Sequence, residues 1–160
     1  MPDPLDHPSI QRVRDRLAEL GATGEVRVLP DSVRTAAAAA AVVGCEVGAI
    51  ANSLVFDADG TPVLILTSGA HRVDTDKCAA EIGVPALRRA QPDFVRTHTG
   101  QVIGGVSPVA HPTALRTFVD PWLQRHDEVW AAAGHPNALF ATSYAELLRI
   151  TGGEPLDVET

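Results

Sequence analysis

A glycine-rich segment near the middle of the chain carries the residues best suited to bind a reacting group through the main chain. Residues 100–108 read Gly-Gln-Val-Ile-Gly-Gly-Val-Ser-Pro, with three glycines and one proline. Glycine lets a ligand approach the backbone closely, and proline fixes the direction in which the chain leaves. Exposed N–H groups in such a turn can bind a carbonyl or a developing oxyanion. A purely structural corner of a sheet is an equally good interpretation of these residues.

Other common catalytic motifs are not found in the sequence. The glycine-rich segment has neither the lysine of a P-loop nor the spacing of a dinucleotide fingerprint. Ser107 is not part of a G-x-S-x-G elbow, and Cys45 follows Gly44 at an expected helix end, where the helix dipole disfavours a thiolate. None of the six histidines is paired at the spacing of metal ligands, so we expect no bound metal and no cofactor.

Composition and charge restrict the class of protein. The 160 residues include 20 acidic and 13 basic side chains, a net charge of −7, and 45% are hydrophobic, which is ordinary for one globular domain. The acidic balance argues against binding nucleic acid by bulk electrostatics. A local basic face stays open as an alternative: Arg12, Arg14 and Arg16 recur on one expected helix, and Arg88 and Arg89 are adjacent. We expect contacts to a nucleic-acid backbone there, although a solvated surface explains the same residues.

Cysteine usage and the termini indicate the compartment. Cys45 and Cys78 are isolated, as is typical of a reducing interior. The N-terminal residues are polar and lack the apolar core of a signal peptide. The longest apolar stretch, 36–43, is far shorter than the roughly 20 residues that span a bilayer. We therefore expect a cytoplasmic protein without a membrane partner.

Interleaved helical and strand patterns predict one mixed α/β domain. Residues 1–8 are expected to be a flexible lead-in, 9–152 the domain, and 153–160 a frayed polar tail. Expected helices are those capped by Ser9, Thr35, Asp74 and Ser143, together with a short one over 92–98 and one opened by Asp120; expected strands are 25–29, 54–56, 62–66, 115–119 and 138–141. Asp57 to Thr61 form the expected hairpin turn.

The order of these residues resembles the YbaK/EbsC family, the editing domains associated with prolyl-tRNA synthetase. The likeness runs roughly from Ser9 to Gly152. Its most specific part is the Gly-Gly-Val-Ser-Pro segment, which follows a Thr-Gly pair and, earlier, a Leu-Val-Phe hairpin strand. The matching positions are Thr35, Asn52 to Phe56, Gly60, Val63 to Leu66, Gly69, Asp74, Thr99-Gly100, Gly104 to Pro108, Asp120 and Gly134.

The resemblance implies a fold, an activity and partners. The fold is a single α/β domain with a curved mixed sheet that approaches a barrel and is flanked by helices. The activity is hydrolysis, in trans and without a metal, of the ester in mischarged aminoacyl-tRNA, such as Ala-tRNA or Cys-tRNA of the proline type. The implied partners are the acceptor end of the aminoacyl-tRNA and an aminoacyl-tRNA synthetase. The oligomeric state is left open.

The resemblance also implies the site. The family loop that binds the aminoacyl end through backbone groups matches Gly104 to Pro108, which makes Gly104 and Gly105 candidate catalytic oxyanion donors. Asn52, the third catalytic candidate, stands where the well-studied deacylases have a lysine. Asparagine exchanges hydrogen bonds but adds no charge, so Arg34 or Arg72 are candidate substitutes. The expected substrate-binding residues are Ser53, Gly69, Val106, Ser107, Pro108 and His135, and Asp120 is expected to cap a helix.

Three functions follow from the residues and the resemblance. The first is a trans-editing aminoacyl-tRNA deacylase. The second is a binding module of the same fold that holds an aminoacyl or nucleotide group without hydrolysing it, because asparagine replaces the family lysine. The third is a hydrolase of another small ester or amide. The amino acid and the tRNA are not specified by the sequence.

Overall fold

The computed structural model describes residues 7–22, 24–30 and 35–159. The α-helices are α1 (Pro8–Glu19), α2 (Ala36–Val43), α3 (Thr75–Ile82), α4 (Pro92–Thr99) and α5 (Tyr144–Thr151), with 3-10 helices η2 (Val47–Ala49) and η3 (Pro121–Arg125). The strands are β1 (Val26–Val28), β2 (Ile50–Ala58), β3 (Thr61–Ser68), β4 (Arg88–Arg89), β5 (Arg116–Val119), β6 (Val129–Ala132), β7 (Ala138–Thr142) and β8 (Glu154–Pro155). The prediction of one mixed α/β fold is confirmed.

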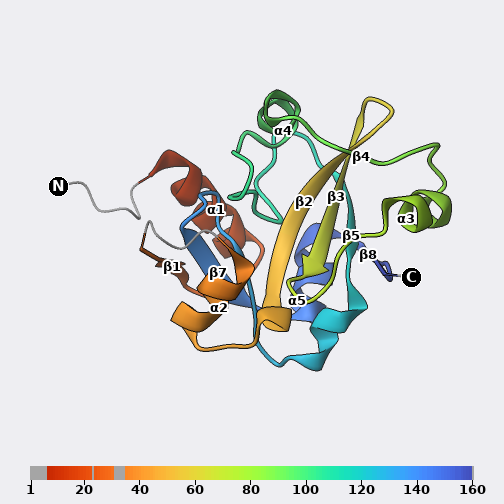
Figure 1. Ribbon diagram of the computed structural model, residues 1–160. Coiled ribbons are helices and arrows are strands. Elements are labelled where there is room, and N and C mark those ends of the chain that lie inside the picture. Colours follow the sequence, from red (N-terminus) through yellow and green to blue (C-terminus); the bar gives the residue numbers. More distant parts are fainter. Residues whose placement is uncertain (1–6, 23, 31–34, 160) are drawn as a thin grey trace.

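One mixed sheet forms the centre of the molecule. Its strand order is β1-β7-β6-β2-β3-β5-β8, and the short strand β4 pairs with β2 beside this path. The β2/β3 hairpin is antiparallel, whereas β6 runs parallel to β2 and β5 runs parallel to β3. Figure 1 shows β2 and β3 as two long neighbouring strands in the middle of the sheet. The sheet does not close into a barrel.

The hairpin is longer than its apolar runs predict. Asn52 pairs with Thr67 and Ser53 with Leu66, so both polar residues belong to β2 rather than to a preceding loop. The turn has positive φ angles at Asp59 and Gly60 (54° and 93°). This conformation suits an Asp-Gly pair in a tight hairpin.

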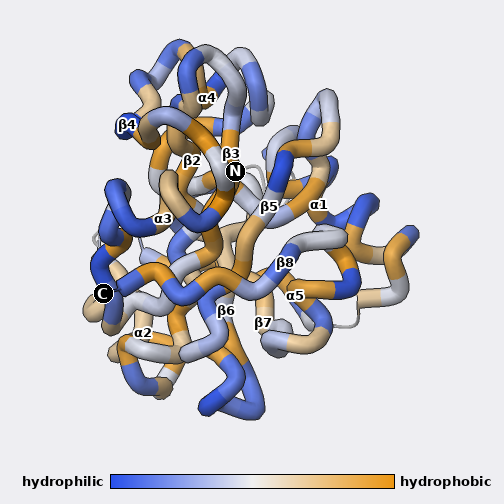
Figure 2. Tube along the Cα trace, turned by 90° about the vertical axis from the view of Figure 1, so that its right-hand side faces the viewer, coloured by the Kyte–Doolittle hydropathy of each residue, from blue (hydrophilic) through white to orange (hydrophobic). Residues whose placement is uncertain are grey.

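Helices cover both faces of the sheet. One face packs against α1, α4 and α5 through a core that includes Val13, Val95 and Leu147, with Ala51 and Val55 from β2. The other face packs against α3 and α2 in two smaller clusters. Figure 2 shows hydrophobic segments along the strands and hydrophilic ones in many of the outer turns. Alternate residues of β2 therefore face different helices, as a period of two requires.

Helix ends follow the expected caps with two exceptions. Thr35, Asp74 and Ser143 each accept a hydrogen bond from a first-turn amide. The prediction that Ser9 caps the first helix is wrong: the imidazole of His7 caps α1, and the helix begins at Pro8. The capping box at Ser143 is only half formed, because Glu146 accepts from Thr142 Oγ1 at 2.7 Å.

Residues 153–159 are packed and not frayed, so that expectation is wrong for them. Strand β8 pairs with β5, and Leu156 and Val158 are buried beside α3. The amide of Asp74 donates to Val158 O at 2.7 Å. Most of the expected lead-in, residues 1–6, lies outside the described residues. No helix in the described part is long and apolar enough to cross a membrane.

Candidate functional site

The sheet splits along one edge of β2. On this side β6 pairs with Ile50 and Ala51, and β4 pairs with Phe56 and Asp57. Neither strand pairs with residues 52–55, whose only neighbouring strand in the described part is β3. A cleft of about 440 Å³ lies along this open edge.

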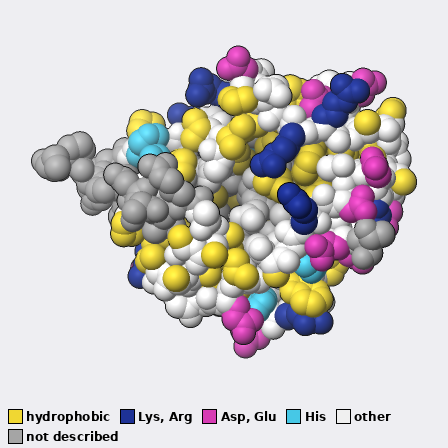
Figure 3. All heavy atoms as spheres, in the orientation of Figure 1, with side chains coloured by type: hydrophobic (Ala, Val, Ile, Leu, Met, Phe, Trp, Pro, Cys, Tyr) yellow, Lys and Arg dark blue, Asp and Glu magenta, His cyan; other side chains and the backbone are white. Residues whose placement is uncertain are grey.

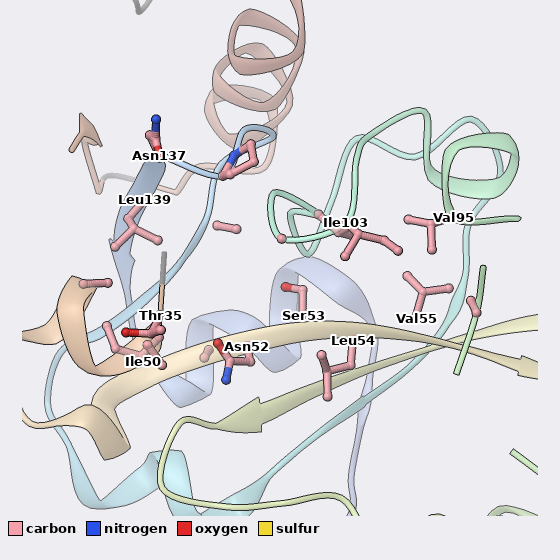
Figure 4. A pocket seen from close by; sticks show the side chains of 18 of the residues that line it. Thr35, Ile50, Asn52, Ser53, Leu54, Val55, Val95, Ile103, Asn137 and Leu139 are labelled. Atoms are coloured by element: carbon pink, nitrogen blue, oxygen red, sulfur yellow. The ribbon is translucent and has the colours of Figure 1, made fainter. Parts of the chain in front are cut away.

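Segments far apart in the sequence form the walls of the cleft. Strand β2 contributes residues 50–56, and the start of α2 contributes Thr35, Ala36 and Ala39. The opposite wall comes from Val95 of α4 and from the glycine-rich segment, and a third wall comes from the 136–139 segment. Figure 4 shows β2 running beneath the loop that carries Ile103, with Asn137 and Leu139 to one side.

The cleft is almost free of charge. Among the described residues that line it, Arg89 is the only charged side chain, and no aspartate, glutamate or histidine lines it. Figure 3 shows basic side chains beside a hydrophobic surface near the centre of the face seen in Figure 1. A cleft with one cation and otherwise uncharged lining suits a small ligand with a nearby anionic group. The described lining offers no side chain for general acid–base catalysis in neutral solution.

Asn52 and Ser53 both line the cleft but lie on opposite faces of β2. Figure 4 shows Ser53 and Val55 pointing toward the side of Ile103 and Val95, whereas Asn52 and Leu54 point the other way. The Ser53 Oγ is buried and has no hydrogen-bond partner among the described residues. A buried hydroxyl without a partner is unusual in a folded protein and is a reason to look for a ligand group at this point.

The glycine-rich segment forms a wall of the cleft through a tight turn. The Gly105 amide donates to Val102 O at 3.0 Å, and Gly104 has a φ of 89°, as the third residue of a type II turn does. Gly104 lines the cleft. Of the two amides expected to bind an oxyanion, that of Gly105 is therefore already engaged inside the turn.

Position 105 requires glycine for a different reason from position 104, namely the lack of space for a side chain. It is buried, and a Cβ at this position would lie 2.6 Å from the carbonyl carbon of His135 and 2.7 Å from the nitrogen of Pro136. The turn and the 135–137 loop can therefore approach each other only because residue 105 has no side chain. Gly105 holds two walls of the cleft together.

Val106, Ser107 and Pro108 have separate positions. Val106 lines the cleft, but Ser107 is fully buried and does not. The Ser107 amide donates to Gln101 Oε1 at 2.7 Å, and its hydroxyl donates to Val109 O. Pro108 lines a second cavity on another part of the surface. The structure thus does not bring Ser107 and Pro108 into the cleft.

Gln101 is a residue of this region that the sequence analysis did not single out. Its buried side chain accepts from Ser107 N and donates to Val109 O at 3.3 Å and to Ala110 O at 3.4 Å. The ring of His111 lies 2.8 Å, Nε2 to O, from the Ser107 carbonyl. This polar network fixes the 101–111 loop from inside. A buried glutamine has no distinctive spacing, so only the contacts identify it.

Gly69 and His135 lie at the margins of the site. Gly69 follows β3, where its amide donates to Ile50 O at 2.7 Å and a Cβ would meet Val47 O at 2.5 Å. It does not line the cleft and instead lets the chain pass close to η2. His135 Nδ1 accepts from Asn137 N at 3.1 Å, and its ring contacts the ring of His7. It supports the Pro136–Asn137 wall without lining the cleft itself.

The other candidate groups are not at the cleft. The main chain of Arg72 donates to Glu159, and its side chain does not line the cleft; Arg34 lies outside the described residues. Asp120 caps η3 through a bond from Trp122 N, as expected, and also contacts His71 Nδ1 at 2.7 Å. No group of three or more potential metal ligands occurs among residues 7–22, 24–30 and 35–159.

Three comparisons show which known proteins this chain resembles. The family model described as the aminoacyl-tRNA editing domain matches residues 30–150. The chain is 30% identical over 140 residues to the Bacillus subtilis protein YwhH, covering 87% of this chain and 88% of that protein. A crystal structure of a proposed trans-editing enzyme for prolyl-tRNA synthetase superposes with a TM-score of 0.91 at 44% identity, covering 96% of this chain and 98% of that one.

A longer relative contains a similar segment. The chain is 29% identical over 126 residues to the proline–tRNA ligase of Nitratidesulfovibrio vulgaris. The aligned region covers 72% of this chain and 22% of the ligase. This chain therefore matches about a fifth of that enzyme.

Proposed function

The chain belongs to the family of aminoacyl-tRNA editing domains, and from this membership we propose that it hydrolyses the ester bond of a mischarged aminoacyl-tRNA. The observation that carries the proposal is the neutral cleft at the open edge of β2, with Arg89 as its single charged lining residue among those described. An aminoacyl ester on a terminal ribose matches these two features. The aminoacyl group is small enough for the cleft, and the phosphate attached to the ribose is an anionic group that Arg89 can bind.

The reaction adds one water molecule across the ester. The water oxygen bonds to the carbonyl carbon, the bond from that carbon to the ribose oxygen breaks, and the ribose oxygen leaves with a proton. The products are a free amino acid and a tRNA with a free terminal ribose. Because the described lining contains no carboxylate or imidazole, we assign the orientation of the water to the ribose hydroxyl next to the ester.

Main-chain amides supply the stabilisation of the oxyanion in this proposal. The Gly104 amide is at the cleft and has no intramolecular partner among the described residues. One well-placed donor of this kind is worth about 10²–10³ in rate. Asn52 has the role of orienting the ribose through its side-chain amide, and Arg89 that of binding a phosphate.

The first experiment is a panel of mischarged tRNAs. The tRNA of the proline type is charged with alanine, cysteine, serine or threonine, and release of the amino acid is followed with and without the protein. We expect at least one ester to be cleaved well above its rate in buffer. Cleavage of none of them would exclude the deacylase proposal for these substrates.

A non-catalytic binding module is the second candidate, and Asn52 is the observation that favours it. Asn52 lines the cleft, and its side chain carries no charge. The family resemblance places it where the well-studied deacylases have a lysine. The variant Asn52→Lys separates the two candidates. If the parent is inactive and the variant hydrolyses aminoacyl-tRNA, the parent is a binding protein; an active parent excludes that function.

We further propose that the tRNA is of the proline type and that the protein acts in trans beside a prolyl-tRNA synthetase. The support is similarity to a proline–tRNA ligase and to a proposed trans-editing enzyme for prolyl-tRNA synthetase. The test places the same amino acid on tRNA of the proline type and on another tRNA. We expect faster hydrolysis on the former, and equal rates would contradict this choice of tRNA.

A further inference from the structure

The main-chain N–H and C=O of Ser53 point to the open edge of β2. In a strand, the N–H and C=O of one residue point to the same side, and successive residues alternate. Ile50 O accepts from Gly69 N, on the side of β3, and Val55 O accepts from Ala90 N, on the opposite side. Even-numbered residues of β2 therefore direct their main-chain groups to β3, and Ser53 directs its own to the cleft.

Ser53 meets no neighbouring strand on that side. The pairing with β6 ends at Ala51, and the pairing with β4 begins at Phe56. Within the described residues, neither the N–H nor the C=O of Ser53 has a hydrogen-bond partner. Main-chain groups at an unpaired sheet edge are ready to bind another extended chain.

Among the described residues that line it, the cleft also lacks the usual partner of an ammonium group. No carboxylate lines it within the described part of the chain. An α-aminoacyl ester carries a protonated amine and a carbonyl, with one carbon between them. These two groups have the spacing of the N–H and C=O of one residue in a strand.

We propose that Ser53 binds the aminoacyl group through its main chain. Its C=O accepts a hydrogen bond from the α-ammonium, and its N–H donates to the ester carbonyl, as in one hydrogen-bonded pair of an antiparallel sheet. The site thereby recognises the part that all α-amino acids share. The Ser53 N–H also stabilises the carbonyl oxygen as negative charge develops on it. This inference rests on the proposed deacylase function.

Substrates that differ only in the amine test the inference by kinetics. The wild-type protein is given the same tRNA carrying an alanyl or a propionyl ester, which lacks the α-amino group. Each enzymatic rate is divided by the rate of the same ester in buffer, because the ammonium also activates the ester chemically. We expect the corrected kcat/KM to fall about 10- to 100-fold for the propionyl ester, as the loss of a charged hydrogen bond does.

Equal corrected rates for the two esters would overturn the inference and leave the deacylase function intact. If neither ester is hydrolysed, the deacylase function fails for them, and binding still tests the role of Ser53. For this purpose the ligand is 3′-(L-alanylamino)-3′-deoxyadenosine, whose amide resists hydrolysis, and the readout is amide hydrogen exchange by NMR.

The strand supplies its own control in that measurement. The Leu54 amide faces β3, where Leu54 pairs with Ile65, so it should be protected with or without ligand. The Ser53 amide should exchange at least tenfold more slowly when the ligand is bound, and less so with the 3′-propionylamino analogue. Unchanged exchange at Ser53 under saturating alanyl ligand would overturn the inference.

Discussion

Arg88 and Arg89 are neighbours in a two-residue strand, yet only Arg89 lines the cleft. Successive side chains of a strand point to opposite faces, so the pair provides a variant and its matched control. We expect Arg89→Ala to lower kcat/KM for aminoacyl-tRNA about tenfold, chiefly through KM, because a contact with a phosphate is lost. Arg88→Ala should change it less than twofold.

The measurement is steady-state deacylation of aminoacyl-tRNA by both variants, with their thermal unfolding as a control for folding. Both arginines are exposed, so their replacement should affect stability by no more than a few tenths of a kcal/mol. Equal losses of activity in the two variants would contradict a specific role for Arg89.

Single residues also show how much of the site can be predicted from the sequence alone. Asn52, Ser53, Gly104 and Val106 were expected in the site, and all four line the cleft. Ser107 was expected there as well and is buried instead. Its sequence neighbourhood is the same as that of Gly104, and only the direction in which each residue leaves the turn separates them. That direction depends on long-range packing, which a local pattern does not encode.

At the scale of elements, the cleft depends on contact between the 102–105 turn and the 135–137 loop. We expect Gly105→Val to lower deacylation at least 100-fold, because its Cβ would lie 2.6 Å from the carbonyl carbon of His135 and must push the two walls apart. Overpacking of this kind costs about 1–3 kcal/mol of stability. Most of the protein should therefore stay folded, as measured by circular dichroism and thermal unfolding.

Gly60→Ala is the control for this prediction. Gly60 has a φ of 93° and no atom within 4 Å of an added Cβ, and it lies in the hairpin turn away from the cleft. Its replacement should cost about 1 kcal/mol in backbone strain and leave the deacylation rate unchanged. Full activity of Gly105→Val would show that this contact does not shape the cleft.

The loop that carries the turn should respond to pH through His111. Burial lowers the pKa of His111 below its ordinary value near 6.5. Below that pH the unfolded chain binds a proton more readily than the folded protein does. The free energy of unfolding is therefore not reduced by His111 above about pH 6.5. It falls as the pH is lowered below this value, by at most about 1.4 kcal/mol per pH unit for one proton.

Urea unfolding at pH 7.5 and 5.5 checks this prediction. The parent should lose more unfolding free energy between the two values than His111→Gln does, because the variant has no group to protonate at this position. The comparison removes the contribution of the other histidines, which both proteins share. The same loss in parent and variant would contradict it.

Elements with local signals are the part of the fold that the sequence predicts well. Helix α2 begins after Thr35 and ends before Gly44, and α3 begins after Asp74 and ends before Gly83. These ends can be predicted because a side-chain cap and a glycine in the left-handed region act within one turn. Strands β4 and β8 have two residues each and were not expected. So short a strand has no period to detect, and its pairing partner alone creates it. The open edge of β2 is missed for the same reason, because it depends on where β4 and β6 pair.

At the scale of the whole molecule, the net negative charge of the protein opposes binding of the negatively charged tRNA. The chain has 20 acidic and 13 basic residues, a net charge of −7. Binding of nucleic acid by overall attraction is therefore excluded, and a tRNA must be held by few local contacts. Arg89 at the cleft is one of them, and Arg12, Arg14 and Arg16 on α1 are further candidates.

Salt dependence measures the number of these contacts. Each phosphate neutralised by the protein contributes about −0.7 to the slope of log affinity against log salt for a single strand and about −0.9 for a duplex. We expect a slope of about −1 to −3 for kcat/KM on aminoacyl-tRNA, reduced by close to one unit in Arg89→Ala. An aminoacyl-adenosine ester has no phosphate and should give a slope near zero. The same flat response with tRNA would mean that the protein holds only the aminoacyl nucleoside, and the function would then be that of a small-ester hydrolase.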